Sequence, residues 1–113
     1  MIRVTTVMWF AAFMRRESAR GAFVVAARKG AQQAGAVFVV HNHLDGTATL
    51  YGPAPQAFFD EEDSGERKFE QLLEGKPVSE IDQYLDKQHN FDPDLWIIET
   101  ESGDGSPSLE LVD

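Results

Sequence analysis

The segment VVHNHLDGTATLYGP, residues 39–53, contains the clearest signal for the fold of this 113-residue chain. Two runs rich in β-branched residues, 36–43 and 47–52, flank the dipeptide Asp45-Gly46. Asp-Gly between such runs favours a two-residue hairpin turn, because both turn positions need a positive φ. Pro53 ends the second strand, since proline cannot donate a hydrogen bond to a sheet. The sequence therefore predicts a β-hairpin in the middle of the chain.

Upstream of the hairpin we expect a helix and a strand. Thr5 or Thr6 can cap a helix that runs to about Arg20, and Gly21 can end it in the left-handed conformation. The middle of this helix is apolar on almost every side, which predicts burial on more than one face and suggests a dimer contact. Two segments follow, a strand and a glycine-flanked loop: residues 22–28 (AFVVAAR) and 29–35 (KGAQQAG).

Downstream of the hairpin the pattern is less regular. Residues 60–66 (DEEDSGE) predict an acidic loop, whereas 67–73 fit either a helix or an edge strand. A strand is favoured there, because Gly75-Lys76-Pro77 follows as a stop. Ser79 can cap a second helix that ends near Gln88. Two final segments are a strand and a tail: residues 94–101 and 102–113.

The order of these elements predicts an α+β fold with the sequence α-β-β-β-(β)-α-β. We expect a mostly antiparallel sheet of four to five strands, with two helices on one face. Residues 1–101 then form a single domain, and residues 102–113 form a flexible C-terminal tail.

Composition is that of an ordinary globular protein, with 42% hydrophobic and 26% charged residues. The chain has no cysteine, which excludes disulfides and cysteine-ligated zinc and fits the reducing cytoplasm. The longest apolar run, residues 7–14, is far shorter than the roughly 20 residues that cross a bilayer. The sequence therefore predicts a cytoplasmic protein without a membrane partner.

The net charge of −9 is unevenly distributed. Residues 1–59 carry six basic and two acidic side chains, a net charge of +4, whereas residues 60–113 carry four basic and seventeen acidic ones, −13. Nucleic-acid binding through the basic half is one alternative function, although the acidic whole disfavours a polyanion. The residues that would carry it are Arg15, Arg16, Arg20, Arg28 and Lys29.

Two histidines in the hairpin raise the hypothesis of a metal site. His41 and His43 are two residues apart, so in a strand they share a face, as metal ligands must. Pairing through the predicted turn sets them opposite Leu50 and Ala48, with no acidic residue facing either one. A metal site needs three or four ligands. The remaining ligands would have to come from a later segment, FDPDLWIIETE (91–101), which offers Asp92, Asp94 and Glu99.

The same later segment resembles part of a nuclease signature. Pro93-Asp94 resembles the start of the PD-(D/E)xK motif, and the order of elements matches the core of that fold. The carboxylates and lysine of that family lie on its second and third core strands, which here contain neither. A metal-dependent phosphodiester hydrolase with a degenerate nuclease-like core therefore remains an alternative only.

Three motifs together are similar to those of a small bacterial family, domain of unknown function 1491. They are MWFAAFMRR (8–16), LDGTATLYGPAP (44–55) and FDPDLWIIE (91–99). The resemblance spans nearly the whole chain. It implies a cytoplasmic bacterial protein, and it carries over no functional residues.

The sequence favours a non-catalytic protein-interaction or regulatory module, without a cofactor, that self-associates as a dimer or binds another protein. Aromatic residues and arginine on a rigid element are typical of interfaces. The candidate interaction surface is Trp9, Phe13, Arg16, Tyr51 and Pro53. Burial in the core is an equally good interpretation of Trp9 and Phe13.

Overall fold

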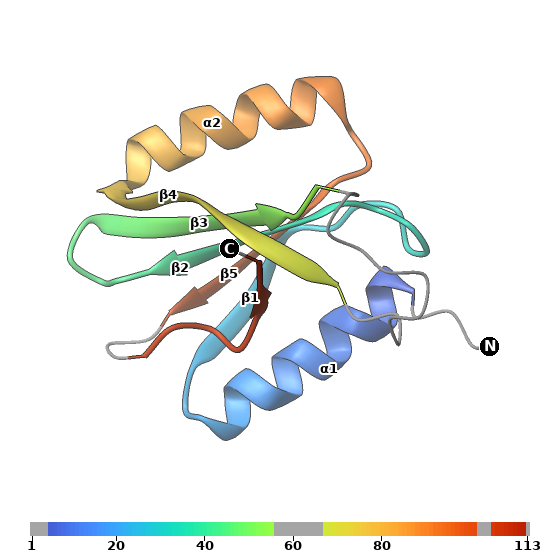
Figure 1. Ribbon diagram of the computed structural model, residues 1–113, viewed down its shortest axis with the longest axis horizontal. Coiled ribbons are helices and arrows are strands. Elements are labelled where there is room, and N and C mark those ends of the chain that lie inside the picture. Colours follow the sequence, from blue (N-terminus) through green and yellow to red (C-terminus); the bar gives the residue numbers. More distant parts are fainter. Residues whose placement is uncertain (1–4, 56–66, 102–104, 113) are drawn as a thin grey trace.

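The computed structural model describes residues 5–55, 67–101 and 105–112, so the acidic segment 60–66 lies outside the described residues. The described residues form two helices and six strands (Figure 1). In chain order these are α1 (Thr6–Ala19), β1 (Phe23–Arg28), β2 (Val37–Asn42), β3 (Thr47–Pro53), β4 (Lys68–Pro77), α2 (Val78–Phe91), β5 (Trp96–Glu101) and β6 (Glu110–Leu111). The α+β class and the predicted order of elements are confirmed, with β6 as an additional strand.

The strands belong to one sheet with the order β1-β5-β2-β3-β4-β6. The pairs β1/β5, β2/β3 and β3/β4 are antiparallel, whereas β2/β5 and β4/β6 are parallel. The sheet is therefore mixed and six-stranded, not the mostly antiparallel sheet of four to five strands that was expected. The difference arises because β5 enters the sheet beside β2 only after the α2 crossover, and a crossover is what a parallel pair requires. The sixth strand lies in the segment expected to be a tail.

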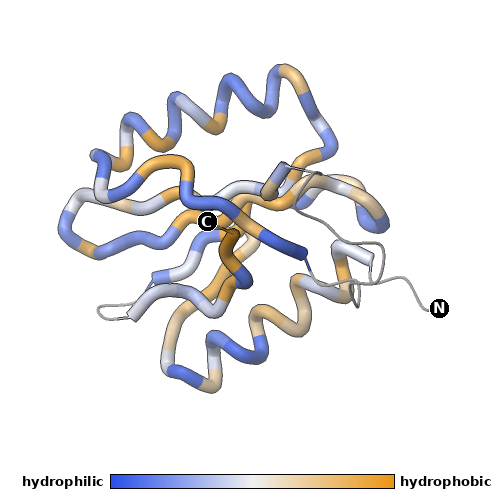
Figure 2. Tube along the Cα trace, viewed as in Figure 1, coloured by the Kyte–Doolittle hydropathy of each residue, from blue (hydrophilic) through white to orange (hydrophobic). Residues whose placement is uncertain are grey.

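The two helices lie on opposite faces of the sheet (Figure 1). Successive strand residues point to opposite faces. Val39 packs with Trp9 and Phe13 of α1, whereas the next residue, Val40, packs with Leu85 of α2. Figure 2 shows the hydrophobic segments concentrated in the strands between the helices. The expectation that both helices cover one face is wrong, because the central strands are apolar on both faces and both must be buried.

Helix α1 begins and ends as its sequence indicates. The Thr5 hydroxyl accepts a hydrogen bond from the Met8 N–H at 3.2 Å, and Gly21 follows the helix with a φ of 85°. The buried residues form one stripe at helical spacing: Thr6, Trp9, Phe13 and Glu17. Met8 is 51% exposed, so the expected burial on more than one face is wrong. The helix rests on the sheet with a single face.

The hairpin has a three-residue loop, Leu44-Asp45-Gly46, because the His43 N–H donates to the Thr47 carbonyl at 3.0 Å. Side chains fix this loop locally. The Asn42 Oδ1 accepts from the Leu44 N–H at 2.8 Å, and the Asp45 Oδ1 accepts from the N–H and the hydroxyl of Thr47 at 3.0 and 2.6 Å. The additional loop residue shifts the pairing of the two strands by one residue. As a result, each residue of β2 has a different partner on β3 from the one predicted.

The actual register sets His41 opposite Thr49 and Asn42 opposite Ala48. The predicted pairs, His41 with Leu50 and His43 with Ala48, are therefore wrong. Leu50 and Ala48 instead pack in the core beneath α2.

The ambiguous segment 67–73 is a strand, as favoured, and β4 continues through the expected stop to Pro77. Gly75 permits this, because its φ of 59° lets the chain pass an irregular stretch of the β3/β4 pairing. Helix α2 then begins at Val78 with Pro77 as its N-cap and no side-chain cap, so the predicted cap at Ser79 is wrong. Neither helix of the described chain is long and apolar enough to cross a membrane.

Candidate functional site

His41 and His43 lie side by side on the α1 face of the sheet. Their ring centroids are 4.5 Å apart with the rings at 67°. The Nε2 of His43 shares a hydrogen bond with the Thr49 hydroxyl at 2.8 Å, and the same hydroxyl accepts from the Gly75 N–H at 3.2 Å. Thr100 faces His41 across the β2/β5 pairing and is 1% exposed. The imidazoles therefore lie in a hydroxyl-rich environment formed by neighbouring strands.

The acidic residues of the hypothetical metal site do not converge on His41 and His43. In the parallel β2/β5 pair, Val37 stands beside Trp96 and His41 beside Thr100. Asp92 and Asp94 precede Trp96, so they lie at the opposite end of these strands from the histidines. Glu99 is separated from the histidines in another way, because it stands beside Val40, whose side chain points to the α2 face. Within residues 5–55, 67–101 and 105–112, no group of three or more His, Asp or Glu side chains could hold a metal ion.

The predicted interaction surface is divided between the core and the surface. Trp9, Phe13 and Tyr51 are 7%, 0% and 4% exposed, and the rings of Trp9 and Phe13 stack with centroids 5.0 Å apart. Arg16 and Pro53 are exposed, and the Arg16 guanidinium lies 5.9 Å from the centroid of the Phe13 ring. The three aromatic residues therefore act in packing, and only Arg16 and Pro53 remain at the surface.

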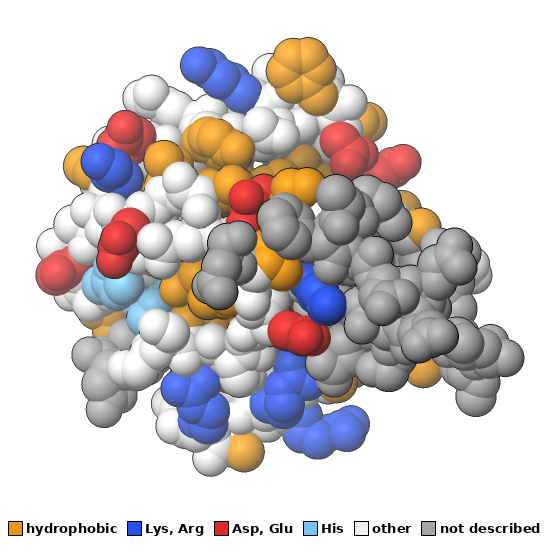
Figure 3. Space-filling view, in the orientation of Figure 1, with side chains coloured by type: hydrophobic (Ala, Val, Ile, Leu, Met, Phe, Trp, Pro, Cys, Tyr) orange, Lys and Arg blue, Asp and Glu red, His pale blue; other side chains and the backbone are white. Residues whose placement is uncertain are grey.

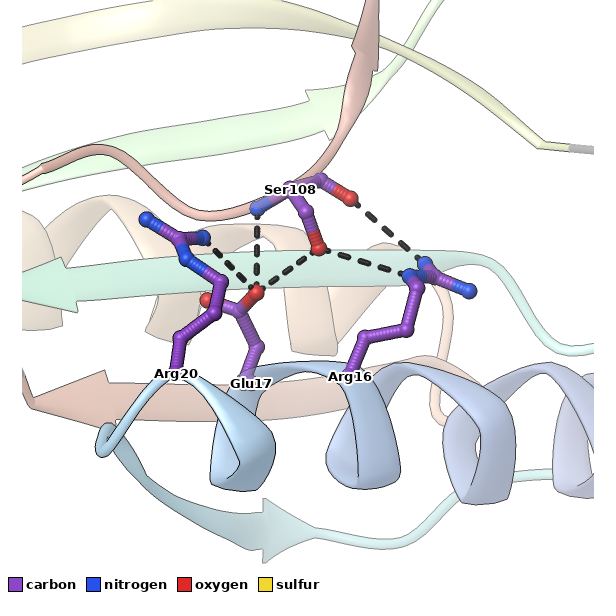
Figure 4. Close-up of polar contacts among 4 residues, drawn as sticks. All are labelled: Arg16, Glu17, Arg20 and Ser108. Carbon is purple, nitrogen blue, oxygen red and sulfur yellow. Dashed lines mark hydrogen bonds and ion pairs between the residues drawn. The ribbon is translucent and has the colours of Figure 1, made fainter.

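A buried carboxylate on α1, Glu17, was missed by the sequence reasoning. Glu17 is 2% exposed, and its Oε2 accepts hydrogen bonds from Arg20 Nη1 at 3.0 Å, from the Ser108 N–H at 3.2 Å and from the Ser108 hydroxyl at 2.7 Å (Figure 4). Arg16 Nε in turn donates to the Ser108 hydroxyl at 3.4 Å. A glutamate four residues after Phe13 in the buried stripe is a signal that such partners must exist, since a buried charge needs them.

The basic residues of the N-terminal half do not form one surface. Figure 3 shows Lys and Arg side chains gathered over α1 at the bottom of the view. Arg16 and Arg20 contact Ser108 and Glu17 there. Arg28, by contrast, ends β1, and its partner on β5 is Ile97, which packs towards α2. The structure thus divides the basic residues between the two faces of the sheet.

Strand β1 presents an uncovered surface that the sequence reasoning also missed. It pairs with β5 along one side, and no strand of the described residues pairs with its other side. Val24 and Ala26 pack onto the core beneath α1, whereas Phe23 and Val25 are 63% and 38% exposed on the other face. Helix α2 does not cover them, because it packs mainly over β3 and β4. The alternation of the sequence indicates a strand, but only the topology places it at an edge.

Acidic side chains lie beside this uncovered surface. Glu99 and Glu101 are the neighbours of Val25 and Phe23 across the β1/β5 pairing. Burial raises the pKa of Glu99 above its ordinary value, the charge of Glu101 raises it further, and a hydrogen bond from Asn42 opposes both. Both glutamates face the α2 side of the sheet, away from α1 and its arginines.

Comparison with known proteins shows similarity along nearly the whole chain. The family model described as "Protein of unknown function (DUF1491)" matches residues 4–110. A protein from A. tumefaciens, solved in solution, is 43% identical, with a TM-score of 0.84 over 99% of this chain and 97% of that one. A crystal structure of a DUF1491 family protein from Caulobacter crescentus CB15 is 31% identical, with a TM-score of 0.78 over 99% and 100% of the two chains.

An NMR structure of a DUF1491 family protein from the same bacterium is 32% identical and has a TM-score of 0.77, with 100% of both chains covered. No curated protein matches the chain significantly. The family model and these structures confirm the resemblance seen in the three sequence motifs. The chain belongs to the DUF1491 family of proteins of unknown function.

Proposed function

We propose that this chain is a non-catalytic protein-interaction module that self-associates, and that the free edge of β1 is its contact surface. The observation that carries the proposal is the exposure of Phe23 and Val25 on an edge strand whose outer side is paired by no strand in the described part of the chain. Edge strands offer unpaired N–H and C=O groups to another chain, and proteins that stay monomeric protect them. The lack of cysteine fits action in the cytoplasm.

The two edges of the sheet differ in their protection. At the other edge β6 is only Glu110–Leu111 and pairs with Lys68 and Phe69. Beyond it β4 continues to Pro77 with Glu70, Glu74 and Lys76, and such charges and proline protect an edge. On β1 the protective features are confined to the C-terminal end, where a bulge follows Ala26 and Arg28 adds a charge. The segment from Phe23 to Ala26 is apolar and regular. That segment is therefore the part of the sheet edge best suited to bind a strand.

A mass measurement at several concentrations tests the proposal. We expect light scattering to give a mass that rises above that of the 12.6 kDa monomer as concentration increases. The variant Phe23→Ser should weaken this association, because it removes the most exposed apolar side chain of β1. Phe91→Ser is the matched control, since Phe91 is 87% exposed but ends α2. A monomer mass at every concentration would disprove self-association.

A further inference from the structure

We infer that the occupant of the β1 edge is a second copy of this chain, paired antiparallel to β1 about a two-fold axis at Val25, with Arg28 of each copy directed to Glu101 of the other. This inference rests on the proposed function and specifies its partner and geometry. It joins two six-stranded sheets into one continuous sheet.

The bulge in β1 decides which of its side chains share a face. Phe23 and Val25 stand opposite Glu101 and Glu99, two residues apart on each strand. After Ala26 the pairing shifts, so that Arg28 instead of Ala27 is opposite Ile97. Residues directly opposite each other in a sheet share a face. The uncovered α2 side of β1 therefore carries Phe23, Val25 and Arg28, whereas Val24 and Ala26 point towards α1.

These faces restrict the registers in which two β1 strands can pair. Residues that pair across the two copies must point to the same face of the joined sheet. A shift by one residue would pair side chains that point to opposite faces. Centring the pair on Val24 or on Val25 satisfies this condition, and centring it on Val25 pairs β1 along its whole length, from Phe23 to Arg28. Val25 then stands opposite Val25 of the second copy, and Val24 stands opposite Ala26. Because of the bulge, Arg28 takes the position opposite Phe23 that Ala27 would have in a regular strand. The N-terminal half of each strand is thus complementary to the C-terminal half of the other.

The charges on this face are complementary in the same register. Phe23 lies between Glu101 on its own β5 and Arg28 of the second copy. With strands about 4.8 Å apart, the Cα atoms of Glu101 and the second copy's Arg28 are about 10 Å apart, which the two side chains together can span. The Arg28 guanidinium would also cross the exposed Phe23 ring, a favourable cation–π arrangement. Symmetry forms the same contact twice.

Self-pairing explains why acidic and basic groups occupy opposite ends of one exposed face. Glu99 and Glu101 flank the N-terminal half of β1, and Arg28 lies at its other end. A parallel strand addition between copies would instead put both Arg28 residues at one end of the pair and the glutamates of both copies at the other, so that Arg28 of one copy could not approach Glu101 of the other. An antiparallel two-fold is thus the arrangement that brings Arg28 of each copy towards Glu101 of the other.

Sedimentation equilibrium on the full chain, from micromolar to millimolar concentration at low salt, tests this arrangement. We expect a monomer–dimer equilibrium for the natural chain. R28E and E101R should each raise the dimer Kd by at least about tenfold, because each places like charges together. The double variant R28E/E101R exchanges the charges and should return the Kd to within about threefold of the natural value. R15E is the control, since it makes the same charge change as R28E at Arg15, an exposed residue of α1.

A second variant and a second measurement keep the test independent of the contact between Arg28 and Glu101. V25K places two ammonium groups at the two-fold axis and should abolish the dimer, while circular dichroism reports whether the fold is retained. Amide hydrogen exchange of residues 23–26 should slow as concentration rises. A dimer unaffected by R28E and V25K would overturn this inference but leave self-association through another surface. A monomer at all concentrations would overturn both.

Discussion

The Glu17 carboxylate joins two parts of the chain that are 91 residues apart, since its Oε2 accepts both the N–H and the hydroxyl of Ser108. This contact holds the C-terminal segment across α1. From there Leu109 packs onto the core beneath the helix, and β6 pairs with β4. A single buried carboxylate thus attaches the end of the chain to its first helix.

Replacing Glu17 by alanine should destabilise the protein. Hydrogen bonds to charged groups are worth about 1.5–3 kcal/mol, and Glu17→Ala removes several at once, so we expect the free energy of unfolding to fall by about 3 kcal/mol. Urea denaturation measures this change. Ser18→Ala, at the exposed neighbouring position, should change the free energy by less than about 0.5 kcal/mol. Equal effects of the two substitutions would contradict a structural role for the Glu17–Ser108 contact.

Two threonines on the strands that flank β2, Thr49 on β3 and Thr100 on β5, should respond in opposite ways to the same substitution. The Thr100 hydroxyl is buried without a hydrogen-bond partner among the described residues, so Thr100→Val should raise the free energy of unfolding by about 1 kcal/mol. The Thr49 hydroxyl bonds His43 and Gly75. Thr49→Val should therefore lower it by about 1–2 kcal/mol. Thermal melts of both variants check the signs, and a shared direction would refute this reasoning.

The stability of the protein should depend on the ionisation of Glu99. Its pKa is raised in the folded state, mainly by burial, so the native state binds this proton more tightly than the unfolded chain does. The resulting penalty develops as pH rises through the ordinary glutamate pKa and is complete above the raised one. We therefore expect Glu99→Gln to melt at a higher temperature than the natural chain at pH 7.

This advantage of Glu99→Gln should diminish as the pH is lowered towards the ordinary glutamate range, where both states bind the proton. Differential scanning calorimetry across that range measures the trend. Asp86→Asn removes the same charge from the exposed side of α2 and serves as the control for net charge. An advantage that grows on acidification would show that the sign of the Glu99 effect is wrong.

The hairpin loop should gain stability from a glycine at Leu44. Leu44 has a φ of 65° and is 61% exposed, so it is held in the left-handed region without compensating burial. That conformation costs about 1–2 kcal/mol for a residue with a Cβ atom, and glycine avoids this cost but loses more conformational entropy on folding. We therefore expect Leu44→Gly to stabilise the protein by about 0.5–1 kcal/mol. Gly46, with a φ of 90°, provides the opposite case. Gly46→Ala should destabilise by about 1 kcal/mol, and chemical denaturation distinguishes the two signs.

Local sequence determined the features that depend on residues close together in the chain. The Thr5 cap, the positive φ of Gly21, the hairpin around Asp45 and the strand that follows α1 all arise from hydrogen bonds or backbone angles within a few residues. The α+β class follows from the order of such elements. These interactions form between residues that are close in the chain, so the amino-acid sequence alone is sufficient to predict them.

Only the tertiary structure decided where these elements meet. It inserted β5 between β1 and β2, which kept Asp92, Asp94 and Glu99 from converging on the histidines and left β1 at an edge. It buried Trp9 and Phe13, covered each face of the sheet with a different helix, and brought Ser108 to Glu17. The physical reason is that strand pairing and burial depend on partners distant in sequence, and the same alternating pattern fits an edge, a centre or either face until those partners are in place.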